Sequence, residues 1–321
     1  MNKSIPFPFE WITRAEERIS PHINVTPLTL DKELGIYLKW ENHQMTGSFK
    51  ARGAFNKVLS LDSWEQQKGI VAASAGNHGQ GVALAGKFVG APVTVFASQH
   101  ASPLKIEKMR VLGADVRLVP GQYEQAEQEA KRYSAANSNT WISPYNDPQV
   151  IAGQGTIGLE IDRQMELSSA MTVLVPVSGG GLLAGIAASL TEQKNHPKVI
   201  GVQAEASAFM HALFNSGSPD GVPDLPTLAD GLSGPVENGS ITVPLIRAMV
   251  DDLLLVTEED ILYAMAYAYY HYGETIEASA AVGLSAILTG KVKPPAIVVI
   301  SGGNILPELH TQVCTRYEGG L

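Results

Sequence analysis

Residues 68–90, KGIVAASAGNHGQGVALAGKFVG, decide the fold predicted for this chain. The apolar run at 68–74 is typical of a buried β-strand, whereas 77–90 shows helical periodicity and ends on a glycine, a common helix stop. A strand that leads through a glycine-containing turn into a helix is the beginning of a βαβ unit. Units of this kind place successive strands parallel to one another and cover them with helices.

The same alternation repeats along the chain. Near the opening stretch we predict strands at 92–97 and 115–119 and helices at 103–112 and 123–136. Further on, helices that include 182–194 and 258–272 separate near-continuous apolar runs, which predict buried strands at 172–177, 198–203, 253–256 and 296–300. The pattern predicts an α/β fold of two doubly wound domains with largely parallel sheets, in which ligands bind beyond the carboxyl ends of the strands.

The composition excludes several classes of protein. Of the 321 residues, 45% are hydrophobic and only 17% are charged, so the chain can bury a large core and is too apolar for disorder. A net charge of −9 opposes binding to nucleic acid phosphates, and the single cysteine, Cys314, excludes an internal disulfide framework. Residues 1–11 lack a secretion signal, and no run approaches the roughly 20 apolar residues of a membrane span. We therefore expect a cytoplasmic protein without nucleic-acid or membrane partners.

Three glycine-rich turns follow predicted strands, at 74–81, 178–182 and 301–304. Glycine lets the backbone approach a ligand, and a helix that begins at such a turn offers free N–H groups and a partial positive charge. We expect a helix after each turn, and three such turns favour anionic ligands. The second turn also matches the dinucleotide pattern G-x-G-x-x-A, with Glu205 at the end of the next strand, so a nicotinamide-dependent oxidoreductase is an alternative.

A lysine at position 50 lies in the segment TGSFKARG, residues 46–53, where a turn is expected to lead into a helix. Most lysines are solvated surface charges. Lys50, however, stands between Phe49 and Ala51, which suits a partly buried amine. Loss of solvation would lower the pKa of this amine and make it a nucleophile able to form an imine.

Four segments, at 48–50, 74–80, 178–182 and 301–304, resemble in the same order the motifs of pyridoxal-phosphate enzymes of the tryptophan synthase β-subunit type, or fold type II. The resemblance is closest to serine/threonine dehydratases and serine racemases, and it extends to 152–156 and 277–279. It implies a pyridoxal 5'-phosphate cofactor in the cleft between a large domain, residues 1–66 and 146–321, and a small mobile domain, residues 67–145. It also implies a homodimer that acts on a small amino-acid substrate.

The resemblance further implies roles for individual residues. Lys50 would hold the cofactor as an imine and act as base and acid on the Cα proton of the substrate. The other cofactor contacts would be Phe49 against the ring, Asn77 at the ring hydroxyl, Ser301 at the pyridine nitrogen, Glu277 beside the ring, and Ser178, Gly179, Gly180, Gly181 and Leu182 around the phosphate. The substrate carboxylate would be received by Ser74, Ala75, Gly76, Asn77 and His78. For the His78 side chain, a capping or packing role is favoured over proton transfer.

Two departures from the family pattern refine the expected chemistry. Serine racemases carry a second serine, the base on the opposite face of the substrate, where this chain has Ala75, so we expect elimination rather than racemisation. The family's divalent-metal site pairs a glutamate with an aspartate, whereas here Glu205 is matched with His211. Because magnesium and calcium prefer oxygen ligands, we predict no divalent metal.

The sequence thus predicts a lyase that eliminates the β-hydroxyl group of L-threonine, L-serine or a related amino acid and yields a 2-oxo acid and ammonia. A serine racemase, a synthase that replaces the β-substituent and a non-enzymatic amino-acid sensor are alternatives. The loop at 224–239 contains Ala229-Asp230-Gly231, which resembles a family element near the active site. The rest of the loop differs from the best-known threonine dehydratases, and it leaves the side chain of the substrate open.

Overall fold

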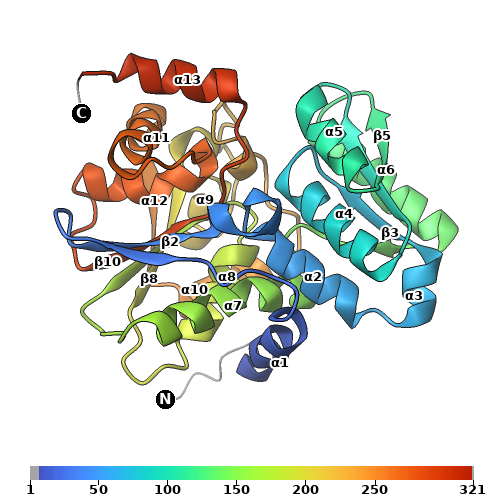
Figure 1. Ribbon diagram of the computed structural model, residues 1–321, viewed down its shortest axis with the longest axis horizontal. Coiled ribbons are helices and arrows are strands. Elements are labelled where there is room, and N and C mark those ends of the chain that lie inside the picture. The colour runs from blue at the N-terminus through green and yellow to red at the C-terminus, as the bar shows by residue number, and fades with distance from the viewer. Residues whose placement is uncertain (1–6, 320–321) are drawn as a thin grey trace.

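The computed structural model describes residues 7–319 and shows a chain built around two sheets (Figure 1). Residues 1–6, part of the segment predicted to lack a secretion signal, lie outside this range. The larger sheet has the strand order β1-β2-β10-β7-β8-β9, and the smaller sheet has the order β5-β4-β3-β6. Each described strand pairing is parallel except that of β1 with β2. The prediction of an α/β fold with two largely parallel sheets is confirmed.

The strands of the larger sheet are β1 (Leu28–Asp31), β2 (Ile36–Trp40), β7 (Thr172–Pro176), β8 (Lys198–Ala204), β9 (Asp252–Val256) and β10 (Ala296–Ile300). Those of the smaller sheet are β3 (Ile70–Ala73), β4 (Val93–Ser98), β5 (Asp115–Val119) and β6 (Thr140–Trp141). We call the smaller sheet with helices α4 (Asn77–Val89), α5 (Pro103–Val111) and α6 (Tyr123–Asn137) the small unit, and the larger sheet with the helices from α7 (Pro148–Gln164) to α13 (Pro307–Arg316) the large unit.

The helices are α1 (Phe9–Ile19), α2 (Lys50–Ser60), α3 (Ser63–Lys68), α4 (Asn77–Val89), α5 (Pro103–Val111), α6 (Tyr123–Asn137), α7 (Pro148–Gln164), α8 (Gly181–Leu190), α9 (Phe209–Asn215), α10 (Thr242–Met249), α11 (Glu258–Tyr272), α12 (Ala278–Leu288) and α13 (Pro307–Arg316). Short 3₁₀ turns are η1 (Glu41–His43), η2 (Met45–Gly47), η3 (Glu205–Ser207) and η4 (Asp230–Leu232). In Figure 1 the small unit lies to the right, the large unit to the left, and α2 between them.

The predicted strands and most predicted helices occur within a few residues of their expected ends. The helix predicted at 182–194 ends at Leu190, because the chain then turns tightly, with Gln193 N–H donating to the Leu190 carbonyl, and approaches Pro197. The hairpin of β1 and β2 was not predicted. It adds an antiparallel edge to the larger sheet, and its turn contains Gly35 in the left-handed region.

Alternate side chains of the central strand β7 pack into different apolar cores on the two faces of the sheet. Val173 and Val175 of β7 lie in the apolar core that includes α7 and α8, whereas Leu174 lies in the core that includes α11 and α12. A third core lies under the small sheet, and it contains Ala51 and Phe55 of α2. Helix α2 therefore packs against the small unit although it also contacts α7 of the large unit.

The contact of α2 with α7 depends on glycine. A Cβ atom on Gly153 of α7 would lie 2.7 Å from the carbonyl oxygen of Arg52 and the Cα atom of Gly53. Only a glycine lets the two helix backbones approach this closely. The segment at 152–156, noted for its resemblance to a family motif, thus holds α2 against α7.

Four buried charged side chains fix α2 in the same interface. The guanidinium of fully buried Arg52 donates at 2.7 Å to Glu41 and at 2.7 Å to Glu160 of α7, and Lys39 of β2 donates at 2.7 Å to Glu160. Two positive and two negative charges balance in this cluster. Burial alone would raise the pKa of Glu160, but the charges of Arg52 and Lys39 lower it below its ordinary value. Because unpaired buried charges are costly, the cluster permits one position of α2.

The substitution Glu160→Gln tests this cluster. It leaves the buried cations Arg52 and Lys39 with one carboxylate between them, and breaking a buried ion pair typically costs about 3–5 kcal/mol, the loss in free energy of unfolding that we expect. Urea unfolding followed by circular dichroism measures this loss. As a control, Glu129→Gln breaks only the exposed pair with Arg132 and should leave the midpoint near that of the wild type. Equal midpoints for the two variants would contradict the stabilising role of the cluster.

Candidate active site

Lys50 is the first residue of α2 and lies where the two units meet. Its Nζ atom donates to the carbonyl oxygen of Pro144 at 2.8 Å and lies 5.1 Å from the centre of the Phe49 ring. Burial lowers the pKa of Lys50 to about 8, although the negative charge of Glu277 raises it. About one-tenth of this amine is therefore neutral, and so nucleophilic, at pH 7, far more than for an ordinary lysine.

The loop that leads into Lys50 is fastened to the end of β10. Thr46 has a positive φ of 62°, an uncommon conformation for a residue with a side chain. Gly303 N–H donates to the Gly47 carbonyl at 2.9 Å, and Phe49 N–H donates to the Ser301 carbonyl at 3.1 Å. Two segments separated by some 250 residues, 46–50 and 301–304, thus form one substructure.

The glycine-rich turns at 74–81 and 178–182 lead into α4 and α8, as predicted. Each of these helices follows a glycine, Gly76 or Gly180, and no side chain caps its first turn. The side chains of Asp62, Asp147 and Thr257 cap α3, α7 and α11, whereas α1, α5 and α12 resemble α4 and α8 in having no side-chain cap. The first N–H groups of α4 and α8 therefore remain available to an anion.

These two helix starts lie close to Lys50. A Cβ atom on Gly81 of α4 would be 3.1 Å from the Lys50 carbonyl oxygen. A Cβ atom on Gly179, just before α8, would be 2.3 Å from the ring of Tyr145, the residue that follows the Pro144 partner of Lys50. The Lys50 amine and the two potential anion sites therefore lie close together.

The turn at 301–304 does not lead directly into a helix, and this prediction is wrong. Helix α13 begins only at Pro307, because Gly303 and Asn304 are held by the loop before Lys50 instead. The absence of a side chain at Gly302 makes room for a carboxylate, since a Cβ atom there would lie 2.8 Å from Glu277 Oε1. This turn borders a carboxylate and is not an anion site.

Glu277 connects the large unit to the small one. Its Oε1 atom accepts a hydrogen bond from Asn77 Nδ2 at 2.7 Å, and Asn77 Oδ1 accepts from Asn304 Nδ2 at 2.8 Å. Burial and the charge of Asp230 raise the pKa of Glu277 to about 7, while Lys105 and the bond from Asn77 lower it. Glu277 therefore exchanges a proton readily near neutral pH.

His78 is buried, and its Nε2 atom lies 2.9 Å from the Ile142 carbonyl oxygen. Burial and the positive charge of Lys50 lower the pKa of His78 to about 3. The ring is therefore neutral and uses one N–H group to bind the chain. This arrangement favours the packing role over direct proton transfer.

The remaining predicted residues have varied surroundings. Leu182 is part of the apolar core, so only its main chain faces a ligand. Ser74 Oγ accepts from Gly76 N–H at 3.0 Å, whereas Ala75 offers only a methyl group. The side chain of Ser301 is 3% exposed.

Two residues that support the turn before α8 were not predicted. Thr242 Oγ1 donates to the Gly179 carbonyl at 2.6 Å, and Tyr145 packs on the same turn while its hydroxyl accepts from Glu237 N–H at 2.7 Å. Tyr145 lies in the irregular segment before α7, and Thr242 is the first residue of α10, so both are far from this turn in the sequence. Nothing local marked them as neighbours of the turn.

Within residues 7–319, no group of three or more His, Cys, Asp and Glu side chains is arranged to hold a metal ion. His211 lies on the short helix α9, where its N–H donates to Gln203 Oε1. No helix in the same range is both long and apolar enough to cross a membrane.

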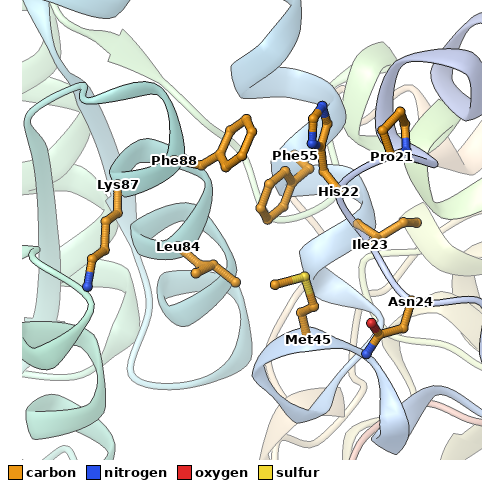
Figure 2. A pocket seen from close by; sticks show the side chains of 9 residues that line it. All are labelled: Pro21, His22, Ile23, Asn24, Met45, Phe55, Leu84, Lys87 and Phe88. Atoms are coloured by element: carbon orange, nitrogen blue, oxygen red, sulfur yellow. The ribbon is translucent and has the colours of Figure 1, made fainter.

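A separate cavity of about 530 Å³ lies between α2, α4 and the segment before β1 (Figure 2). It is lined by Pro21, His22, Ile23, Asn24, Met45, Phe55, Leu84, Lys87 and Phe88. Figure 2 shows Leu84 and Phe88 of α4 facing Met45, Phe55 and His22 across the cavity. Its walls are mostly apolar and include no predicted site residue. The cavity marks an incompletely packed part of the contact of α4 with α2 and the segment before β1.

A family model described as pyridoxal-phosphate dependent enzyme matches residues 19–303. The L-threonine ammonia-lyase of Thermotoga maritima is 44% identical over 273 residues, which cover 84% of this chain and 67% of that protein. The catabolic L-threonine dehydratase of Escherichia coli K12 is 37% identical over 314 residues, which cover 94% of each chain.

Solved structures show the same similarity. The processed form of threonine deaminase isoform 2 from Solanum lycopersicum superposes with a TM-score of 0.88 at 30% identity and covers 97% of this chain and 88% of that one. Maize serine racemase superposes with a TM-score of 0.88 at 29% identity and covers 97% of this chain and 98% of that one. The similarity therefore includes both units and the seam between them.

The lowered pKa of Lys50 can be measured directly. In the cofactor-free protein we expect acetylation of Lys50 to increase with pH through a midpoint of about 8, because only the neutral amine reacts. Quantitative peptide mass spectrometry at a series of pH values gives this midpoint. Lysine amide in the same mixture is the control, with an ordinary pKa near about 10.4. A Lys50 midpoint equal to that of the control would show that the amine is not desolvated.

Proposed function

This chain belongs to the pyridoxal-phosphate-dependent enzyme family, and we propose that it converts L-threonine, L-serine or a related β-hydroxy amino acid into a 2-oxo acid and ammonia. Relatives named as threonine ammonia-lyase and threonine dehydratase support this reaction. The glycine pattern at 179–184 lies inside the family match, so it no longer supports a nicotinamide-dependent oxidoreductase. The observation that carries the proposal is the desolvated amine of Lys50 beside two uncapped helix starts.

The residues present fit pyridoxal 5'-phosphate. The chain offers a partly buried amine of lowered pKa for its aldehyde and, at Gly179, a turn whose close approach to Tyr145 only glycine allows. Two buried hydroxyl oxygens in the loop before Lys50, Thr46 Oγ1 and Ser48 Oγ, have no hydrogen-bond partner in the described part of the chain. Such orphaned groups are expected where a polar ligand completes a site.

In this proposal each predicted contact has a physical reason. The N–H groups at the start of α8, in the segment 178–182, would hold the phosphate, Phe49 would pack against the ring, and Ser301 would meet the pyridine nitrogen. Asn77 would donate to the ring hydroxyl, with Glu277 as its neighbour. The bound cofactor supplies an electron-withdrawing ring conjugated to the Cα atom of the substrate.

The chain's own groups perform the proton transfers. The start of α4, residues 74–78, binds the substrate carboxylate through main-chain N–H groups. Lys50 in its neutral form would accept the Cα proton, and the β-hydroxyl group would take up one proton and leave as water, so that one water molecule is removed in all. Hydrolysis of the dehydrated product would then consume one water molecule and yield the 2-oxo acid and ammonia, with no net release of water.

We also propose that the small domain, residues 67–145, moves relative to residues 1–66 and 146–321. Two ion pairs across the seam have partly exposed partners, which solvent can replace as the domain moves: Lys105 with Asp230 at 2.9 Å and Lys131 with Glu237 at 2.6 Å. The cavity beside α4 leaves room for rotation. Binding of the substrate carboxylate at α4 would draw this domain toward Lys50 and exclude water.

Elimination is favoured over racemisation by one residue. Ala75 lies in the turn before α4 and carries no group that could return a proton to the opposite face of Cα. A serine racemase is the second candidate because the maize enzyme shares the fold, and a synthase that replaces the β-substituent is the third. We further propose a cytoplasmic homodimer, in keeping with the resemblance and with the single, buried cysteine Cys314.

A substrate panel tests the proposed reaction. With L-serine, L-threonine and bulkier β-hydroxy amino acids, the cofactor-loaded protein should release ammonia and 2-oxo acid in equal amounts. Chiral chromatography of the L-serine reaction should show D-serine forming more slowly than the oxo acid, because position 75 lacks a proton donor. Faster formation of D-serine would overturn the argument from Ala75. Failure to release ammonia from every substrate would favour the amino-acid sensor.

A further inference from the structure

Asn304 joins three separate parts of the site through one side-chain amide. Its Nδ2 group donates to the Thr46 carbonyl at 2.6 Å and to Asn77 Oδ1 at 2.8 Å. Its Oδ1 atom accepts from Lys108 Nζ of α5 at 3.2 Å. Both N–H groups and the oxygen of this amide are therefore in use, two toward the small unit and one toward the loop before Lys50.

The bond to Asn77 fixes which way the Asn77 amide faces. Because Asn77 Oδ1 accepts from Asn304, Asn77 Nδ2 must point to the other side, where it donates to Glu277 at 2.7 Å. Without Asn304, the Asn77 amide could rotate by half a turn and present its oxygen to the carboxylate. Such a rotation would exchange a donor for an acceptor at the centre of the site.

The bond to Thr46 holds a strained conformation. Thr46 has a φ of 62°, and a non-glycine residue keeps such a backbone only where its surroundings impose it. The Asn304 amide also lies against the next residue, because a Cβ atom on Gly47 would be 3.2 Å from both of its polar atoms. Asn304 thus supports the turn that ends three residues before Lys50.

We propose that Asn304 is a positioning residue that acts through Asn77: it orients the Asn77 amide toward Glu277 and keeps α4 in register with the Lys50 loop. This inference rests on the proposed function, because Asn77 and Lys50 acquire their chemical roles there. Asn304 itself touches no reacting atom in this assignment. Its effect on turnover is indirect and is transmitted mainly through Asn77, with a smaller part through the bond to Thr46.

The test uses the cofactor-loaded enzyme and two variants, so that one remains informative if the other fails to fold. Asn304→Ala removes the amide, and Asn304→Asp keeps its size but places carboxylate oxygens against the Thr46 and Asn77 oxygens. Because a small misplacement of reacting groups is costly, we expect kcat per bound cofactor to fall by about 10- to 100-fold. The KM for the amino acid should change much less, since the N–H groups of α4 remain. The cofactor should also dissociate faster, and its visible circular dichroism should weaken.

A double-mutant cycle separates positioning from mere stability. If Asn304 acts through Asn77, adding Asn304→Ala to Asn77→Ala should lower kcat by no more than about twofold. Independent losses that multiply in the double variant would overturn the proposal, as would variants with wild-type kcat and circular dichroism. The matched control is Asn42→Ala, which removes a neighbouring asparagine bonded to Glu274 and should leave all three readouts unchanged.

Failure of the proposed function is distinguishable from failure of this inference. If the wild type binds the cofactor but releases no ammonia, the lyase proposal fails. The cofactor dissociation rates and circular dichroism of the same variants then still decide the role of Asn304. Wild-type values of both in Asn304→Ala and Asn304→Asp would refute it.

Discussion

The guanidinium of Arg52 constrains the position on which the chemistry of this chain depends. The guanidinium is fully buried and donates hydrogen bonds to Glu41 and Glu160. The backbone of Arg52 lies against Gly153 of α7. A buried cation between two carboxylates tolerates little displacement. Lys50 lies two residues earlier on the same helix, so the position of its amine follows from a cluster that includes no predicted site residue.

Burial then sets the proton affinities of the site. It lowers the pKa of Lys50 to about 8 and raises that of Glu277 to about 7, so the two groups titrate close together. The same burial, with the charge of Lys50, lowers the pKa of His78 to about 3 and keeps its ring neutral. An amine and a carboxyl group that both exchange protons near neutral pH are the features that a base-catalysed elimination requires.

Local sequence patterns predicted most of the fold and the positions of the main site segments. Apolar runs mark buried strands such as β7, and glycine turns mark the starts of α4 and α8, because these signals act within a few residues. The hairpin of β1 and β2 escaped prediction, because β1 is a short, partly exposed strand and the buried strand β2 contains Lys39, which interrupts its apolar run. The expected helix directly after the turn at 301–304 was wrong, because distant partners hold this turn. The bond between Asn77 and Glu277 joins residues 200 positions apart and could not be derived from spacing.

The most direct test of the central claim is to locate the cofactor on the chain. The protein is saturated with pyridoxal 5'-phosphate, treated with sodium borohydride to make the lysine–cofactor linkage permanent, digested and examined by peptide mass spectrometry. The structure predicts one reduced adduct per chain, on the peptide that contains Lys50, and none after Lys50→Ala. An adduct on a different lysine, or no adduct at saturation, would contradict the role of Lys50.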